Sequence, residues 1–131
     1  MSLLRWLLKE EAGTLLQKRW QILNAWRPIK TVYKDPLAVC DARTVSDTDD
    51  LVPGKIIYKD HERESWTVKA NPNHRWYFKY AMQPSEVLLI KCFDSKEDVA
   101  RRAPHSAFQD PRHVDKEWRE SIEIRTMVFY D

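Results

Sequence analysis

The C-terminal segment 121–130 constrains the fold most, because its residue types alternate with a period of two. One set is mostly branched or aromatic and contains Ile122, Ile124, Thr126, Val128 and Tyr130. The other set begins with polar and charged residues and contains Ser121, Glu123, Arg125, Met127 and Phe129. Since successive side chains of a strand point to opposite faces of a sheet, this segment is predicted to form a strand.

Other short segments have the same character and are separated by turn-forming residues. Further strands are expected at 20–26, 55–59, 65–69, 74–80 and 87–93. The last of these is nearly apolar throughout, as is typical of a strand covered on both faces. Residues 30–55 are interpreted as a long polar connection. The number of short strands predicts an antiparallel sandwich or barrel.

The first residues predict a helix. Leu4, Leu7, Leu8, Leu15 and Leu16 recur at helical spacing, which indicates an amphipathic helix over 3–17. Its polar face carries both signs of charge, so packing on the protein's own sheet is favoured over a membrane surface, with partner binding as the alternative. The apolar run is too short to span a bilayer and has no signal-peptide cleavage site, so we expect a cytoplasmic protein.

Length and charge limit the classes of function. The 131 residues are expected to form a single domain, 1–131, with a helix in 1–18 and a β-rich core in 19–131. The 22 basic and 20 acidic residues are interspersed, and this balance gives no electrostatic basis for binding nucleic acid. Cys40 and Cys92 are expected to be free, buried thiols. With only Gly13 and Gly54, a glycine-rich phosphate loop is excluded.

Four blocks occur in order along the chain: RWQILNAWRPI at 19–29, DPLAVCDAR at 35–43, NPNHRWY at 71–77 and RESIEIR at 119–125. Together they resemble the fungal AsaB-type hydroxylase/desaturase family, which is related to cephamycin methoxylase-like proteins. The resemblance implies a scaffold like that of non-haem iron, 2-oxoglutarate-dependent oxygenases that tailor secondary metabolites. The expected fold is mainly β (α+β), a partial double-stranded β-helix of the jelly-roll or cupin-like kind with a leading amphipathic helix.

Chains of that family are about twice as long, and their His-x-Asp motif lies upstream of the Trp-Arg-Pro block. This chain therefore resembles the C-terminal half of the family, N-terminally truncated, with the first two iron ligands missing. His105, in RAPHSAF at 102–108, matches the family's distal iron ligand.

A facial iron site needs three protein ligands, which one imidazole cannot supply. We therefore expect no metal and no cofactor, with His105 acting as a general acid/base. The alternatives are a relic histidine held by a loop carbonyl, or Fe(II) and 2-oxoglutarate bound with ligands from elsewhere. His113 and Asp115 form a literal His-x-Asp, but they follow His105 in a charged loop and are not expected to bind metal.

Arg119 and Arg125 are both candidates for an arginine that clamps a carboxylate bidentately. Arg119-x-Ser121 resembles the arginine-x-serine arrangement of the wider superfamily. Both arginines have odd numbers, so a continuous strand would direct both to one side. The alternative for either is a surface arginine paired with Glu120 or Glu123.

Two clusters of residues are expected to contact a small-molecule substrate. They are Asn24, Trp26 and Arg27 at the end of the first strand, and His74, Trp76 and Tyr77 in the aromatic segment. The alternative is that the aromatic side chains are simple core and that His74 is structural.

The preferred hypothesis is a metal-independent tailoring enzyme of fungal secondary metabolism, of the isomerase, cyclase or dehydratase type. One alternative is an Fe(II)/2-oxoglutarate-dependent hydroxylase or desaturase, and another is a non-catalytic pseudoenzyme or partner subunit. Half of a double-stranded β-helix leaves open edges and apolar surface, so a two-fold homodimer is expected.

Overall fold

The computed structural model describes residues 8–59 and 62–131, most of them in strands and the loops between strands. Its elements in chain order are the 3-10 helix η1 (Lys9–Glu11), the helix α2 (Ala12–Leu15), strands β1 (Trp20–Pro28) and β2 (Leu37–Cys40), the 3-10 helix η2 (Ala42–Thr44), strands β3 (Leu51–Ile57), β4 (Glu62–Val68), β5 (Trp76–Phe78), β6 (Leu88–Asp94) and β7 (His105–Ala107), the 3-10 helix η3 (Pro111–His113) and strand β8 (Ser121–Phe129). The prediction of a mainly β protein is confirmed.

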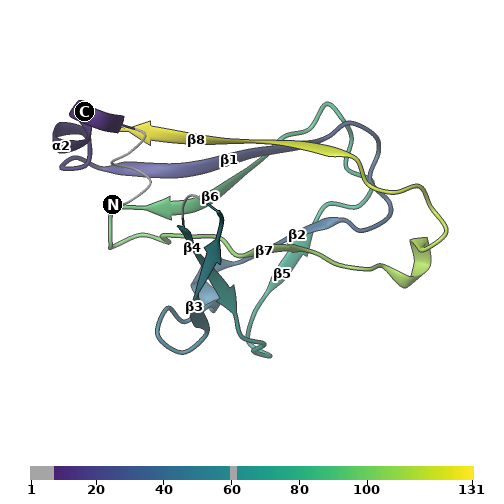
Figure 1. Cartoon of the computed structure of the whole chain (residues 1–131). Coiled ribbons are helices and arrows are strands. Elements are labelled where there is room, and N and C mark those ends of the chain that lie inside the picture. Colours follow the sequence, from purple (N-terminus) through teal and green to yellow (C-terminus); the bar gives the residue numbers. More distant parts are fainter. Residues whose placement is uncertain (1–7, 60–61) are drawn as a thin grey trace.

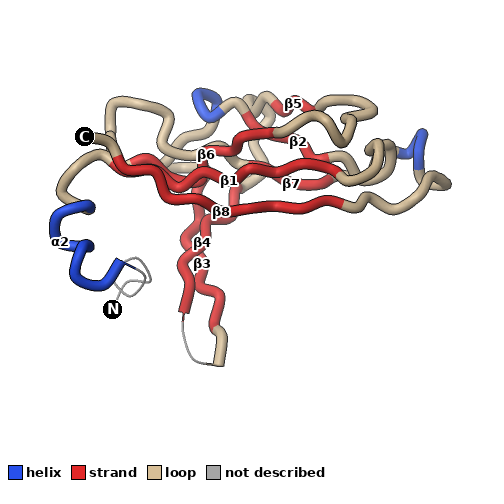
Figure 2. The backbone as a smooth tube through the Cα atoms, turned by 90° about the horizontal axis from the view of Figure 1, so that it is seen from above, coloured by secondary structure: helices blue, strands red, loops and turns tan. Residues whose placement is uncertain are grey.

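The strands form two three-stranded sheets and one hairpin. One sheet has the order β6-β1-β8 and the other has the order β5-β2-β7, with all neighbours antiparallel. The two sheets lie one above the other, and the β3–β4 hairpin projects away from them (Figures 1 and 2). These sheets are the partial double-stranded β-helix that the family resemblance implies, and they do not close into a barrel.

The apolar core lies between the two sheets. Trp26 from β1 and Ile90 from β6 form a cluster with Val32 and Met82, and Leu37 at the start of β2 packs against it. Val32 and Met82 also form an isolated antiparallel bridge, which holds the two connecting loops together. Truncating the fully buried Ile90 to alanine is expected to cost about 2–5 kcal/mol, because it leaves a cavity in this small core.

The β6-β1-β8 sheet has an inner face, which is directed at the second sheet, and an outer face. The residues of β1 show which side chains lie on each. Its buried residues Asn24, Trp26 and Pro28 alternate with the less buried Ala25 and Arg27. Because Trp26 belongs to the core cluster, the even-numbered residues of this stretch lie on the inner face. Their partners in β8 therefore face the same way.

A buried carboxylate fastens one end of the same sheet. Asp94, the last residue of β6, has no exposed surface, and it accepts hydrogen bonds from Arg19 Nη2 at 2.9 Å and Lys91 Nζ at 3.0 Å. Gln21 and the backbone N–H of Lys96 also donate to it. Hydrogen bonds from Arg19 are the largest cause of the strongly lowered pKa of Asp94.

The structure corrects several of the expected element boundaries. Within the described residues the leading helix comprises only η1 and α2, and no side chain caps the start of α2. The part of the expected helix at 3–7 lies outside the described residues. The supposed connection 30–55 contains β2 and most of β3. The expected strand 74–80 is reduced to β5, because His74 turns toward Asp50. The final strand, β8, matches its expected range closely.

Cys40 and Cys92 are both free, as predicted. Cys40 is buried, whereas Cys92 is half-buried, and burial raises the pKa of its thiol. No helix in the described ranges 8–59 and 62–131 is long and apolar enough to cross a membrane.

Candidate functional site

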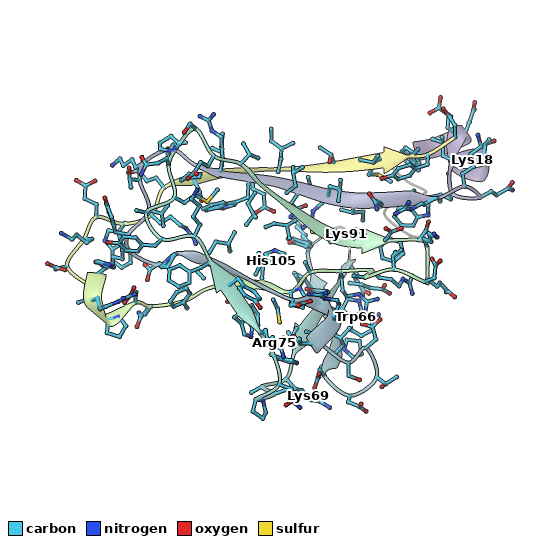
Figure 3. All side chains as sticks on the ribbon, turned by 180° about the vertical axis from the view of Figure 1, so that it is seen from behind. Lys18, Trp66, Lys69, Arg75, Lys91 and His105 are labelled. Carbon is cyan, nitrogen blue, oxygen red and sulfur yellow. The ribbon has the colours of Figure 1, made fainter. Side chains whose placement is uncertain are left out.

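His105 lies on β7, the edge strand of the second sheet, and its side chain is directed toward the first sheet. It pairs with Val39 of β2, and Leu37, two residues before Val39, packs against the core cluster. Since alternate residues of a strand share a face, His105 points to the same side as Leu37. Figure 3 shows His105 between the two layers. The imidazole therefore faces the space between the sheets.

A backbone carbonyl fixes the tautomer of the His105 imidazole. His105 Nδ1 lies 3.0 Å from the carbonyl oxygen of Ala103, so Nδ1 carries the proton and donates. Within the described residues Nε2 makes no hydrogen bond, and its lone pair is available. Donation from the second nitrogen to a carbonyl is the arrangement that orients metal-binding histidines. It is equally the contact expected of a histidine that a loop merely holds in place.

The loop that holds His105 is itself bonded to both sheets. The N–H of Ala103 donates to the carbonyl of Lys91 in β6 at 2.8 Å, and the N–H of Cys40 in β2 donates to the carbonyl of Pro104 at 2.8 Å. The backbone just before His105 is therefore anchored on each side, which limits the positions that the ring can take.

On the opposite sheet, three polar side chains form a network on the inner face. Asn24 in β1 is only 1% exposed, and its Nδ2 donates a short hydrogen bond to the carboxylate of Glu123 in β8. Arg125 Nε donates to Asn24 Oδ1 at 3.1 Å. One buried amide thus holds an acid and a base in place at once. Arg125 itself is exposed, and its terminal nitrogens make no hydrogen bonds to the described residues.

Arg119 lies two residues before β8 and reaches the same side of the sheet. Its Nη1 donates to the carbonyl oxygen of Asp35 at 2.9 Å, and its guanidinium lies 5.7 Å from the ring centre of Trp26. Trp26 pairs with Glu123, so the structure directs Arg119 and Arg125 to one face. Asp35 has a left-handed φ of 51°, an uncommon conformation that the bond from Arg119 helps to hold.

The donor set of the described chain does not fit a complete iron site. His105 offers one nitrogen, whereas a facial triad needs three ligands. No group of three His, Cys, Asp or Glu residues that could hold a metal ion occurs within 8–59 and 62–131. His113 and Asp115 belong to no such group within these ranges, and the His113 ring packs against those of Tyr33 and Tyr80, with ring centres 5.9 and 5.4 Å away.

The first expected cluster of substrate-contacting residues is divided by the sheet. Trp26 is 4% exposed and belongs to the core, and Asn24 is buried beneath the charged pair described above. Arg27 is exposed and pairs with Ile122, so it lies on the outer face. Alternation of side chains along β1 explains this separation. Asn24 and Trp26 remain on the inner side, and Arg27 does not join them.

The second expected cluster is also divided. Tyr77 pairs with Val39 and so shares a face with His105, whereas Trp76 pairs with Cys40 and faces the other way. Tyr77 is 56% exposed. Of the three residues in this cluster, Tyr77 is therefore the one that lines the inner side together with His105.

His74 has a structural role. Its Nε2 lies 2.9 Å from Asp50 Oδ2, and the side chains of both residues are almost completely buried. Hydrogen bonds from Asn71, from His74 and from the backbone of Ser46 lower the pKa of Asp50 to about 2. The pair joins the 46–50 turn to the loop before β5, and this use occupies the imidazole nitrogen that a ligand would need.

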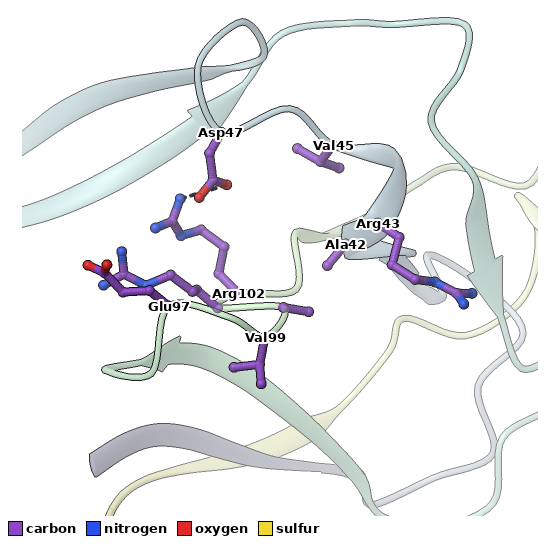
Figure 4. A pocket seen from close by; sticks show the side chains of 9 residues that line it. Ala42, Arg43, Val45, Asp47, Glu97, Val99 and Arg102 are labelled. Carbon is purple, nitrogen blue, oxygen red and sulfur yellow. Dashed lines mark ion pairs between the residues drawn. The ribbon is translucent and has the colours of Figure 1, made fainter. Parts of the chain in front are cut away.

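The structure also has a shallow cavity of about 300 Å³ (Figure 4). It is formed by the segments 42–47 and 97–102, and an ion pair between Arg102 Nη1 and Asp47 Oδ1 at 3.0 Å closes one side of it. None of the residues expected to form the site lines this cavity. The candidate site is instead the open space between His105 and the inner face of the β6-β1-β8 sheet.

Glu123 and Asp50 make buried contacts in this part of the structure, but they were not among the predicted site residues. Glu123 could have been found, because the alternation in 121–130 already places it on the same face as Arg125. Asp50 lies in an acidic run within a supposed loop, and nothing in the local sequence indicates that His74 binds it.

Comparison with known proteins gives a consistent family. A family model described as an oxidoreductase/YMDC permease-like domain matches residues 1–129. The chain is 45% identical to the hydroxylase/desaturase efuI of Hormonema carpetanum, over 98% of this chain and 47% of the relative. It is 46% identical to the hydroxylase/desaturase asaB of Aspergillus flavus, over 92% of this chain and 60% of the relative. The chain spans about half the length of the curated relatives it matches.

Solved structures agree. The iron and alpha-ketoglutarate-dependent endoperoxidase NvfI superposes with a TM-score of 0.87 at 32% identity, covering 97% of this chain and 48% of that one. An alpha-ketoglutarate-dependent dioxygenase, phiK from a fungal species, is 37% identical over 92% of this chain and 45% of the relative. The match to NvfI confirms the expected fold.

These names correct two expectations. The expectation of no cofactor is wrong, because the relatives and structural neighbours are named as dependent on iron and alpha-ketoglutarate, which is 2-oxoglutarate. They also favour the oxygenase alternative over the metal-independent isomerase, cyclase or dehydratase. This chain belongs to the AsaB-type hydroxylase/desaturase family.

Proposed function

We propose that this chain forms part of an Fe(II)- and 2-oxoglutarate-dependent oxygenase that hydroxylates or desaturates a small molecule in fungal secondary metabolism. In this role His105 supplies one iron ligand through Nε2, and an arginine on the inner face binds the 2-oxoglutarate carboxylate. When bound, iron with 2-oxoglutarate as co-substrate would activate dioxygen, which is the oxidant in such reactions. The two remaining iron ligands would come from a polypeptide segment other than residues 8–59 and 62–131.

The observation that carries the proposal is the position of His105. Its imidazole projects from an edge strand into the space between the sheets, with Nδ1 bonded to the Ala103 carbonyl and Nε2 bonded to none of the described residues. A nitrogen held in this way is suited to coordinating a metal, because the carbonyl fixes both the tautomer and the ring orientation.

We assign the carboxylate of 2-oxoglutarate to Arg119 and a polar group of the substrate to Arg125. Arg119 is braced by the carbonyl of Asp35 and the ring of Trp26, which leaves its second terminal nitrogen for a bound anion. Arg125 is held by Asn24 beside Glu123, so this position offers both a donor and an acceptor. Such a pair suits a hydroxyl or carbonyl group better than a carboxylate, which Glu123 would repel.

A chimeric enzyme tests the proposal. Residues 1–131 of this chain would replace the matching region of the efuI relative, which keeps that protein's remaining half. We expect the chimera to bind iron stoichiometrically and to convert 2-oxoglutarate to succinate. His105→Ala should abolish both properties, and Arg119→Ala should weaken 2-oxoglutarate binding about tenfold or more while iron stays bound.

Arg43→Ala provides a matched control, because the Arg43 side chain is 84% exposed and pairs only with its neighbour Asp41 among the described residues. That variant should keep the iron content and turnover of the chimera. A His105→Ala chimera that retains full iron content and succinate formation would refute the proposal.

A further inference from the structure

The segment that carries Arg119 has little buried surface of its own. Residues 114–118 and Glu120 are exposed, and Arg119 is the only half-buried residue of 114–120. Trp118, directly before Arg119, is 72% exposed. Packing into a core therefore cannot fix this segment, and the direction of the Arg119 guanidinium depends on specific contacts with a neighbouring segment.

The neighbouring segment is the loop between β1 and β2, residues 29–36, which lies at the end of the sheets opposite α2 (Figure 1). The N–H of Ile29 donates to the carbonyl oxygen of Glu120 at 3.0 Å, and Lys30 Nζ forms an ion pair with the Glu120 carboxylate. Lys30 also lies 3.6 Å from the Glu117 carboxylate, but that side chain is 84% exposed and the pair is weak. The loop is therefore held most firmly to the chain on the C-terminal side of Arg119.

Consecutive residues of the loop contact consecutive residues of the Arg119 segment. Lys34 Nζ lies 3.6 Å from the centre of the Trp118 ring, which is a cation–π contact. The carbonyl oxygen of the next residue, Asp35, accepts the hydrogen bond from Arg119 Nη1 at 2.9 Å. Lys34 thus fixes the residue that directly precedes Arg119, and Asp35 fixes the guanidinium itself.

The same loop is bonded to the strand that carries His105. Pro36, directly after Asp35, is buried, and its carbonyl oxygen accepts a hydrogen bond from the N–H of Phe108 at 3.3 Å. Phe108 directly follows β7. Residues 34–36 therefore contact the Arg119 segment on one side and the end of β7 on the other, so they set the position of Arg119 relative to His105.

We infer that Lys34 is a positioning residue for the carboxylate of 2-oxoglutarate. Through the Trp118 ring it holds Arg119 in the direction in which the second terminal nitrogen of the guanidinium can bind that carboxylate. The inference rests on the proposed function, which assigns the carboxylate to Arg119. Lys34 does not itself contact the anion, because its ammonium group lies over the ring of Trp118.

Substitution of Lys34 in the chimera tests the inference. Lys34→Met removes the ammonium group and keeps a side chain of similar length. We expect the KM for 2-oxoglutarate, and its dissociation constant measured by calorimetry without dioxygen, to rise about two- to fivefold. The kcat at saturating 2-oxoglutarate and the iron content should stay unchanged. Lys34→Arg keeps a cation that stacks on aromatic rings, so it should restore the affinity of the parent.

A double-mutant cycle shows whether Lys34 acts through Trp118. Trp118→Ala should weaken 2-oxoglutarate binding as much as Lys34→Met does, and the double variant should be no weaker than either single variant, because one contact is lost in all three. Trp66→Ala is the matched control. Trp66 is 50% exposed on the projecting β3–β4 hairpin and has the Arg102 guanidinium 5.3 Å from its ring centre, so this variant should keep the affinity of the parent.

The remaining outcomes separate the inference from the proposed function. Unchanged affinity in Lys34→Met, or effects of Lys34→Met and Trp118→Ala that add in the double variant, would overturn the inference, since additive effects would mean that Lys34 contacts the anion directly. If Arg119→Ala weakens 2-oxoglutarate binding while Lys34→Met does not, only the positioning role fails. Unchanged 2-oxoglutarate affinity in Arg119→Ala would refute the assignment of the carboxylate to Arg119, and the positioning role with it.

Discussion

Two polar clusters on the β6-β1-β8 sheet differ in how completely they are closed. Around Asp94, Arg19, Gln21 and Lys91 all donate to a carboxylate with no exposed surface. Around Asn24, by contrast, the amide is buried but the charged groups of its partners face the space between the sheets. The charged groups around Asp94 are paired with one another and stabilise the fold. Glu123 and Arg125 are each held by Asn24, and their charged groups remain available to a ligand.

Among the polar and charged groups of these two clusters, Asp94 should contribute most to stability. Asp94→Ala leaves Arg19 and Lys91 without their shared carboxylate, and we expect the free energy of unfolding to fall by about 3 kcal/mol. Urea unfolding followed by tryptophan fluorescence measures this change. A loss smaller than that of Asn24→Ala would show that the closed cluster is not the more important of the two for the fold.

Asn24→Ala should have an intermediate effect. The amide makes two hydrogen bonds, but Glu123 and Arg125 can turn to water once it is gone, so a loss of about 1–2 kcal/mol is expected. In the chimera this variant should also weaken substrate binding, because Arg125 loses the group that orients it. Unchanged substrate affinity would assign Asn24 to the fold alone.

Acid should weaken the fold through the Asp50–His74 pair as well as through Asp94. The pKa of Asp50 is lowered from 3.8 to about 2, so its contribution is complete above pH 3.8 and is lost as the pH falls toward 2. Asp50→Asn should therefore show a flatter dependence of the unfolding midpoint on pH between 2 and 5. Identical slopes for variant and parent would remove Asp50 from the acid response.

Arg125→Ala should have the smallest effect on stability. Its guanidinium is exposed and makes one hydrogen bond to the described part of the chain, so the free energy of unfolding is expected to change by no more than about 0.5 kcal/mol. Its effect should appear instead in the substrate KM of the chimera. A stability loss as large as that of Asp94→Ala would show that Arg125 serves the fold, as the groups around Asp94 do.

Much of the architecture follows from local pattern. The alternation in 121–130 predicts β8 almost to the residue, and the apolar run 87–93 predicts the position of β6. The expectation that β6 is covered on both faces is wrong, because Leu89 is 68% exposed while Ile90 beside it is buried. The same alternation placed Glu123 and Arg125 on one face. Strand β2 was missed because four residues are too few to show a period. Strand β3 was expected to start at 55 instead of Leu51, because Pro53-Gly54 resembles a turn.

The candidate site depends on contacts between residues far apart in sequence, and only part of it could be predicted. The family resemblance singled out His105, Arg119 and Arg125, but no local signal separates Arg27 from Trp26 or Trp76 from Tyr77 until the strand register is known. The role of His74 depends on Asp50, which lies in another loop. The cofactor was misjudged because the donors within this chain were treated as the complete set.

The double anchoring of the loop before His105 has a mechanical consequence. Ala103 is hydrogen-bonded to Lys91 in one sheet and Pro104 to Cys40 in the other, and the His105 imidazole is hydrogen-bonded to the Ala103 carbonyl. A shift of one sheet relative to the other would displace residues 103–104 and change the orientation of the His105 ring. The direction of His105 Nε2 is therefore coupled to the relative position of the two sheets.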